Sequence, residues 1–124
     1  MWRAYNPNPC GRAIGDCAVR AISAALDVSW DEAYSLLCRE GRQQCDMPSA
    51  DHVWGAVLIS FGFERRAIPS GCPRCYNAEH FCEDHPTGVY VLGFGGHVAT
   101  VRDGVLLDSW DSSKEIPTFY YGSD

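Results

Sequence analysis

Residues 95–108 have the sequence GGHVATVRDGVLLD, in which an Asp-Gly pair separates two apolar segments. Asp-Gly between apolar segments is a strong signal for a β-hairpin with a two-residue turn. With that turn, Arg102 faces Val105, and His97 becomes a diagonal neighbour of Asp108 on the paired strand. Because side chains alternate between the faces of a strand, His97 and Asp108 point to the same side. The stretch therefore predicts a hairpin that brings an imidazole within hydrogen-bonding reach of a carboxylate.

Other segments of the second half predict the rest of an antiparallel sheet. Residues 63–68 and the apolar segment 89–94 are expected to be strands. Residues 116–121 are expected to add an edge strand, because Pro117 stands near its start and cannot donate to a ladder. Residues 69–88 show little periodicity apart from a predicted helical turn near 77–84.

The first half of the chain predicts helices. Residues 1–15 are rich in Pro, Asn and Gly and are expected to form turns. After them, apolar residues at helical spacing predict a helix over 17–26, with Asp16 as its N-cap. Helices followed by an antiparallel sheet indicate an α+β fold.

Two more helices are predicted between this helix and the sheet. Ser29 and Glu32 form a capping box that opens the second helix, which Gly41 is expected to end. Ser49 is expected to open the third helix, which Gly62 closes. The chain thus divides into a helical half, about 16–62, and a sheet half, about 63–121.

Length and composition restrict the class of protein. The 124 residues are 46% hydrophobic and 21% charged, which predicts a single domain, 1–124, with a substantial core. A formal net charge of −6 argues against nucleic acid as the main partner, because phosphate binding needs a cationic surface. No apolar run is long enough to span a membrane, and no apolar signal segment follows Met1. We therefore expect a cytoplasmic protein.

The sequence contains seven cysteines, an odd number that cannot pair completely within one chain. In a reducing compartment, cysteines are more often buried, catalytic or metal-bound than disulfide-linked. Cys17 stands at the predicted helix start, where the partial positive charge and unsatisfied N–H groups stabilise a thiolate. His97, which follows two glycines, is the candidate base, and Asp108 is the candidate carboxylate that fixes the imidazole. In the predicted register, Asp111 falls on the opposite face of the sheet.

The order of these three residues resembles that of the papain-like cysteine peptidase superfamily, in which the Cys opens a helix and the His opens a strand. A closer resemblance is to small uncharacterised proteins of phages and of prophages in Gram-positive hosts. The shared elements are Asn6-Pro-Asn-Pro, the segment GDCAVRAI at 15–22, and the C-terminal His97-Val98, Asp103-Gly104 and Asp108-Ser-Trp110-Asp111-Ser112.

The resemblance implies a papain-like fold, with N-terminal helices packed on a C-terminal sheet. It also implies that Cys17 attacks a carbonyl, that His97 transfers the proton and that Asp108 orients His97. Papain-like enzymes usually carry a Gln shortly before the Cys, and this chain has none there. Asn8 is the nearest amide and is either an oxyanion donor or a turn cap. Residues expected to line the site are Asp16, Gly96 and Trp110.

A second cluster has the spacing of a metal site. Cys72-Pro-Arg-Cys75 is followed by Cys82 and His85, which together predict a closed Cys3His zinc site of structural role within an insertion at 70–86. His80 is a spare ligand. The alternative is that the first two cysteines are loop thiols and that Cys82 packs in the core of a short helix. No organic cofactor is expected.

These observations predict a cysteine-dependent hydrolase or acyl transferase that acts on a peptide or isopeptide bond of a peptide or protein substrate. One alternative is a catalytically weak papain-like binding module of phage origin, which would act on a host protein in the host cytoplasm. A second alternative is a small zinc-stabilised structural domain. Neither nucleic acid nor a membrane is an expected partner.

Overall fold

The computed structural model describes residues 1–69 and 76–122. Within these residues the fold is α+β, with helices packed on a mixed sheet whose strand order is β1-β5-β4-β3-β6-β2. The elements, in chain order, are β1 (Trp2–Ala4), α1 (Cys17–Leu26), α2 (Trp30–Gln44), α3 (Asp51–Ser60), β2 (Glu64–Ala67), α4 (Ala78–Asp84), β3 (Val89–Phe94), β4 (His97–Arg102), β5 (Val105–Asp108) and β6 (Phe119–Gly122).

The predicted hairpin is confirmed. β4 and β5 pair antiparallel with Arg102 opposite Val105, which is the register that the Asp-Gly turn predicts. Asp103 and Gly104 have φ values of 51° and 76°, as a two-residue turn with both central residues in the left-handed region requires. The predicted strand at 89–94 and the helical turn near 77–84 are confirmed as β3 and α4.

The prediction of a purely antiparallel sheet was wrong, because β1 pairs in parallel with β5 at one edge. This strand lies inside the segment that was expected to form only turns. Three residues are too few to show an alternating pattern, and the strand is positioned by contacts distant in sequence. The indole Nε1 of Trp2 and the backbone N–H of Tyr5 both donate to the carbonyl oxygen of Asp108, at 3.1 and 2.8 Å.

The expected edge strand at 116–121 is an interior strand. β6 lies between β3 and β2, and β2 forms the edge. Pro117 suggested an edge because it lacks an N–H group, but the strand begins only at Phe119. The proline therefore precedes the ladder and removes none of its hydrogen bonds.

The helices begin close to their predicted positions, with differences in detail. The side chain of Asp16 makes no capping bond to α1. Helix α2 continues past Gly41 to Gln44. Gly41 is buried, and a Cβ added there would lie 2.8 Å from the carbonyl oxygen of Asp46. This glycine therefore permits a close backbone approach and does not end the helix. Helix α3 begins at Asp51, with Ala50 and not Ser49 as its N-cap.

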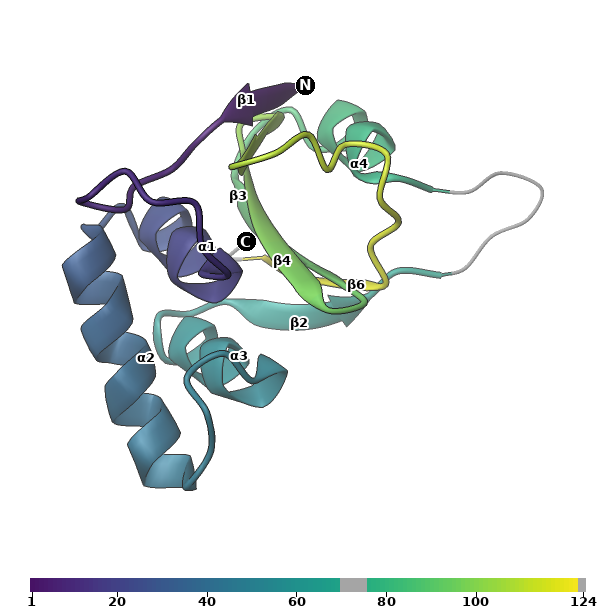
Figure 1. Ribbon diagram of the computed structural model, residues 1–124. Coiled ribbons are helices and arrows are strands. Elements are labelled where there is room, and N and C mark those ends of the chain that lie inside the picture. The colour runs from purple at the N-terminus through teal and green to yellow at the C-terminus, as the bar shows by residue number, and fades with distance from the viewer. Residues whose placement is uncertain (70–75, 123–124) are drawn as a thin grey trace.

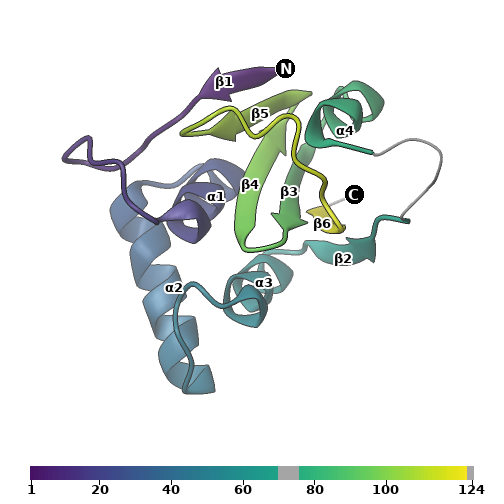
Figure 2. The same ribbon diagram turned by 45° about the vertical axis from the view of Figure 1, so that its right-hand side comes forward.

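Both faces of the sheet are covered. α1 and α3 lie on one face and α4 on the other, and α2 packs on the outer side of α1 and α3 (Figure 1; Figure 2). The first core joins α1, α2 and α3 to Val91, Val98 and Tyr121 of the sheet. The second joins Phe81 and Cys82 of α4 to residues of β3, β4 and β5. Among the described residues, no helix combines the length and the apolar composition that crossing a membrane requires.

Candidate active site

The start of α1 lies beside the start of β4. Cys17 is the first residue of α1 and His97 is the first residue of β4. Farther along the helix, two side chains of β4 donate hydrogen bonds to backbone carbonyl oxygens of α1. Thr100 Oγ1 donates to the carbonyl oxygen of Ala21 at 2.7 Å, and an Arg102 Nη2 donates to that of Ala24 at 2.8 Å. The helix and the strand therefore run alongside each other, and the side chains of Cys17 and His97 meet at one end.

The predicted contact between His97 and Asp108 is present. His97 Nε2 lies 2.6 Å from Asp108 Oδ2, and the carboxylate is only 1% exposed. The same oxygen accepts from Ser112 Oγ at 2.6 Å, and Oδ1 accepts from the Ser109 N–H at 2.8 Å. A buried carboxylate with this many donors stays ionised and holds the imidazole in one orientation.

Cys17 is half-buried and is hydrogen-bonded to the His97 ring and to the backbone N–H of Val98. Nε2 of His97 is bonded to Asp108, which leaves Nδ1 as the ring nitrogen available to the sulfur. Burial alone would raise the pKa of Cys17. The hydrogen bonds from His97 and Val98, with the positive charges of His97 and Arg20, outweigh burial and lower this pKa below its usual value.

The other two groups shift in the directions that favour an ion pair. Burial opposes the charge on His97, but the bonds to Asp108 and Cys17 prevail and raise the pKa of His97 to about 9. Burial also opposes the charge on Asp108, yet the bonds from His97 and Ser112 lower the pKa of this carboxyl. All three shifts favour the ion pair of a Cys17 thiolate and a His97 imidazolium over the neutral thiol and imidazole.

Arg20 is a component of the site that the sequence analysis missed. Its buried guanidinium contacts Asp16 and lies 3.1 Å from Asp108 Oδ1, so it bridges two buried carboxylates. The other oxygen of Asp16 accepts from the indole Nε1 of Trp30 at 2.9 Å. A lone cation inside the apolar run AVRAI was the available signal. Asp16 is thus part of a buried ionic network and not a helix cap.

A cavity of about 450 Å³ opens over Cys17 and His97. Gly96 and Trp110, both expected at the site, line this cavity. The Trp110 ring centroid lies 5.0 Å from that of His97, and the indole is 46% exposed. Asp16 lines a neighbouring cavity instead.

Asn8 lies in the turn before α1 and is not among the residues that line the Cys17 cavity. Its Oδ1 accepts from the backbone N–H groups of Cys10 and Arg12, at 2.9 and 3.4 Å. This arrangement is the turn cap, which was the alternative interpretation of Asn8.

The predicted zinc ligands are only partly described. Cys72 and Cys75 lie outside the described residues, which omit 70–75 of the insertion predicted at 70–86. Cys82 is buried in the second core, and the His85 ring stacks on Phe81 with Nδ1 2.9 Å from its carbonyl oxygen. His80 Nδ1 accepts from the Asn77 N–H in a capping box. Zinc binding stays a prediction, which metal analysis of the purified protein tests.

Comparison of the chain with models of protein families, with curated proteins and with solved structures found no significant match. The motif resemblance to papain-like peptidases therefore stays a prediction. Any assignment of function has to be argued from the side-chain geometry around Cys17.

Proposed function

We propose that the chain is a papain-like cysteine hydrolase or acyl transferase that acts on a peptide or isopeptide bond. The observation that carries the proposal is the position of the His97 ring, which is hydrogen-bonded to Cys17 on one side and to Asp108 on the other. Nucleophile, base and orienting carboxylate in this order constitute the triad arrangement of acyl transfer. The helix-borne Cys and the sheet-borne His agree with a papain-like arrangement.

In the acylation step, the Cys17 thiolate attacks the carbonyl carbon, an S–C bond forms, and the carbonyl π electrons move to oxygen. The oxyanion collapses, the C–N bond breaks, and the leaving amine takes its proton from the His97 imidazolium. Asp108 is the hydrogen-bond acceptor that keeps the ring aligned while His97 gives up its proton and later regains one. The products of this step are a thioester on Cys17 and a free amine.

In the second step, neutral His97 accepts a proton from water as the water oxygen attacks the thioester. The S–C bond then breaks, which releases a carboxylic acid and restores the thiolate. An amine that attacks in place of water gives transfer instead of hydrolysis. The backbone N–H groups of the first turn of α1 have no acceptor within the helix, so they are the donors that we assign to the oxyanion.

Thiol reactivity tests the proposal first. Wild-type protein is treated with iodoacetamide at pH 6, and the modified cysteines are located by mass spectrometry. We expect Cys17 to react at least about tenfold faster than the exposed Cys10 and Cys45, because the neighbouring His97 lowers the pKa of Cys17. His97→Ala should abolish the difference. His52→Ala is the matched control, because His52 also contacts a carboxylate, Asp46, but on the surface.

Acyl transfer is tested with p-nitrophenyl acetate. We expect a burst of p-nitrophenol, one per Cys17, with an acetyl group on that residue, and slower hydrolysis afterwards. Equal reactivity of Cys17, Cys10 and Cys45 would contradict the proposal. A reactive Cys17 that cannot be acylated would favour the catalytically weak binding module instead.

A further inference from the structure

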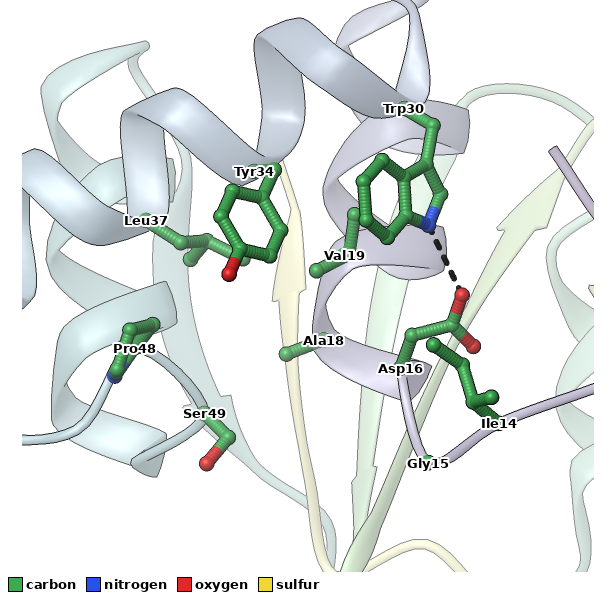
Figure 3. A pocket seen from close by; sticks show the side chains of 10 residues that line it. All are labelled: Ile14, Gly15, Asp16, Ala18, Val19, Trp30, Tyr34, Leu37, Pro48 and Ser49. Atoms are coloured by element: carbon green, nitrogen blue, oxygen red, sulfur yellow. Dashed lines mark hydrogen bonds between the residues drawn. The ribbon is translucent and has the colours of Figure 1, made fainter. Parts of the chain in front are cut away.

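A second cavity, of about 360 Å³, lies beside the Cys17 cavity on the side of α1 that faces α2 (Figure 3). Its walls are formed by the rings of Trp30 and Tyr34 of α2 and by Ala18 and Val19 of α1. Pro48 and Ser49, from the segment before α3, form the opposite wall. The two aromatic rings stack on each other with centroids 5.0 Å apart, so this wall is already formed in the absence of a ligand.

The two cavities share one boundary. Ile14, Gly15 and Ser49 line both of them. His97 and Trp110 line only the Cys17 cavity. A substrate bonded to the sulfur can therefore extend past the shared residues and away from the imidazole.

The position of His97 tells which part of a substrate extends that way. The leaving amine takes its proton from His97, so the amine lies on the imidazole side of the sulfur. The acyl part, which stays on Cys17 as the thioester, lies on the other side, where the second cavity opens.

The lining determines the chemistry that this cavity accepts. Asp16 is the only ionisable carboxylate among its lining residues, and both carboxylate oxygens are engaged, one by Arg20 and one by Trp30. The cavity therefore has no unpaired charge to offer to a Lys or Arg side chain. The remaining walls are aromatic or aliphatic and favour an apolar group.

We propose that this cavity, lined by Trp30, Tyr34 and Val19, binds a large apolar side chain in the acyl part of the substrate. The proposal rests on the proposed function, and it restricts the substrate class to peptides with an aliphatic or aromatic residue on the acyl side of the cleaved bond.

The test uses two series of acetyl-peptide chloromethyl ketones, which alkylate a thiolate at the ketone methylene and release chloride. In one series the variable residue is next to the ketone, and in the other a glycine separates them, so both spacings are sampled. The variable residue is Leu, Phe, Gly or Glu. In at least one series, we expect Leu or Phe to inactivate Cys17 at least about tenfold faster than Gly or Glu.

Variants assign the preference to the cavity. Tyr34→Ala removes an exposed wall, and Val19→Phe fills the interior; both should reduce the Leu-to-Gly rate ratio at least about threefold. Phe61→Ala, a similarly exposed aromatic outside both cavities, should leave the ratio unchanged. Each rate is divided by that for iodoacetamide, which has no side chain to place.

Two results would overturn the inference. One is the absence of an apolar preference in both series, and the other is a preference that Tyr34→Ala leaves intact. Wild-type Cys17 that reacts rapidly with iodoacetamide yet shows either result would overturn only this inference. Failure of the iodoacetamide reaction itself would overturn the proposed function.

Discussion

Asp108 links the candidate nucleophile to the interior of the protein. Its side chain accepts hydrogen bonds from His97, Ser112, Arg20 and the backbone of Ser109, and its backbone carbonyl accepts from β1. The bonds to the side chain favour the ionised carboxylate, and the carboxylate in turn favours the imidazolium. The charge state of the thiol therefore depends on a buried carboxylate and on the donors that surround it.

These shifts predict the pH dependence of acyl transfer. The reaction needs a Cys17 thiolate, whose pKa is lowered, and a His97 imidazolium, whose pKa is raised to about 9. We expect the p-nitrophenyl acetate burst rate to rise as Cys17 loses its proton, at a lower pH than an ordinary thiol would require. With an amide substrate, whose leaving group needs a proton, the rate should fall above about pH 9 as His97 loses its proton.

Asp108→Asn provides the control for this profile. It removes the carboxylate that raises the pKa of His97, so the alkaline decline should move to lower pH. Alkylation by iodoacetamide needs only the thiolate and should show no decline above pH 9. An alkaline limit that is the same in wild type and Asp108→Asn would exclude His97 as its origin.

Arg20 is predicted to stabilise both the fold and the site. Arg20→Met leaves Asp16 and Asp108 buried without their shared cation, which we expect to lower the free energy of unfolding by about 3–5 kcal/mol. Arg20→Lys keeps the charge but loses the planar fork that reaches both carboxylates, so a smaller loss of about 1–3 kcal/mol is expected. Urea denaturation measures both losses.

A surface arginine supplies the matched comparison for these variants. Arg39 is exposed on α2, and Arg39→Met should change the unfolding free energy by less than about 0.5 kcal/mol. The rate at which iodoacetamide alkylates Cys17 in Arg20→Lys, measured as a function of pH, shows whether this substitution raises the pKa of Cys17. Equal stability of Arg20→Met and Arg39→Met would contradict the bridging role.

Among the elements, the β4–β5 hairpin determines which side chains share a face. Its turn fixes the register that places His97 beside Asp108, so a slip by one residue would separate them. Gly104 has a φ of +76° and Asp103 a φ of 51°. The turn residues thus influence the site without touching it.

Gly104→Ala is expected to strain this turn. A Cβ at this position meets its nearest neighbours at 3.4 Å, an ordinary contact, so the cost comes from the positive φ and not from a clash. We expect a loss of about 2 kcal/mol in the free energy of unfolding, measured by urea denaturation. Asp103→Asn keeps the acceptor for the Gly88 N–H and tolerates the left-handed region, so its effect should stay below about 0.5 kcal/mol. A similar loss in both variants would contradict this account.

The elements that the sequence predicted well are those determined by neighbouring residues. Asp103-Gly104 determines its own turn, and the apolar spacing after Cys17 defines α1. The failures come from contacts distant in sequence. Gly41 resembles a helix end unless one knows that the loop at Asp46 packs against it, and β1 exists through its pairing with β5.

In the candidate site, too, the sequence predicted what neighbouring residues determine and missed what depends on contacts distant in sequence. His97 and Asp108 share a face because of local strand geometry, which the sequence contains. The meeting of His97 with Cys17 depends on how α1 lies on the sheet, which local pattern does not encode. Arg20 was missed because its two partners become neighbours only after α1 packs against β4.

In the whole molecule, the candidate site exists where the helical layer meets the sheet. α1 and β4 contact each other at three successive positions. Cys17 contacts His97, the carbonyl oxygen of Ala21 accepts from Thr100, and that of Ala24 accepts from Arg102. Thr100 is fully buried, and its hydroxyl bond is therefore shielded from water. The position of the nucleophile relative to the base depends on this alignment of the two layers.

Thr100→Val tests the alignment, because valine has nearly the same shape but no hydroxyl. We expect the free energy of unfolding to fall by about 1 kcal/mol as the bond to the Ala21 carbonyl is lost. The burst rate with p-nitrophenyl acetate should fall by roughly threefold to tenfold, because small displacements of reacting groups slow a positioned reaction. Thr100→Ser keeps the hydroxyl and loses only a methyl group, so it should lose some stability but retain most of the rate. If the burst rate instead follows stability alone across the two variants, the Thr100 hydroxyl does not position the helix, and apolar packing between α1 and β4 would then determine how Cys17 meets His97.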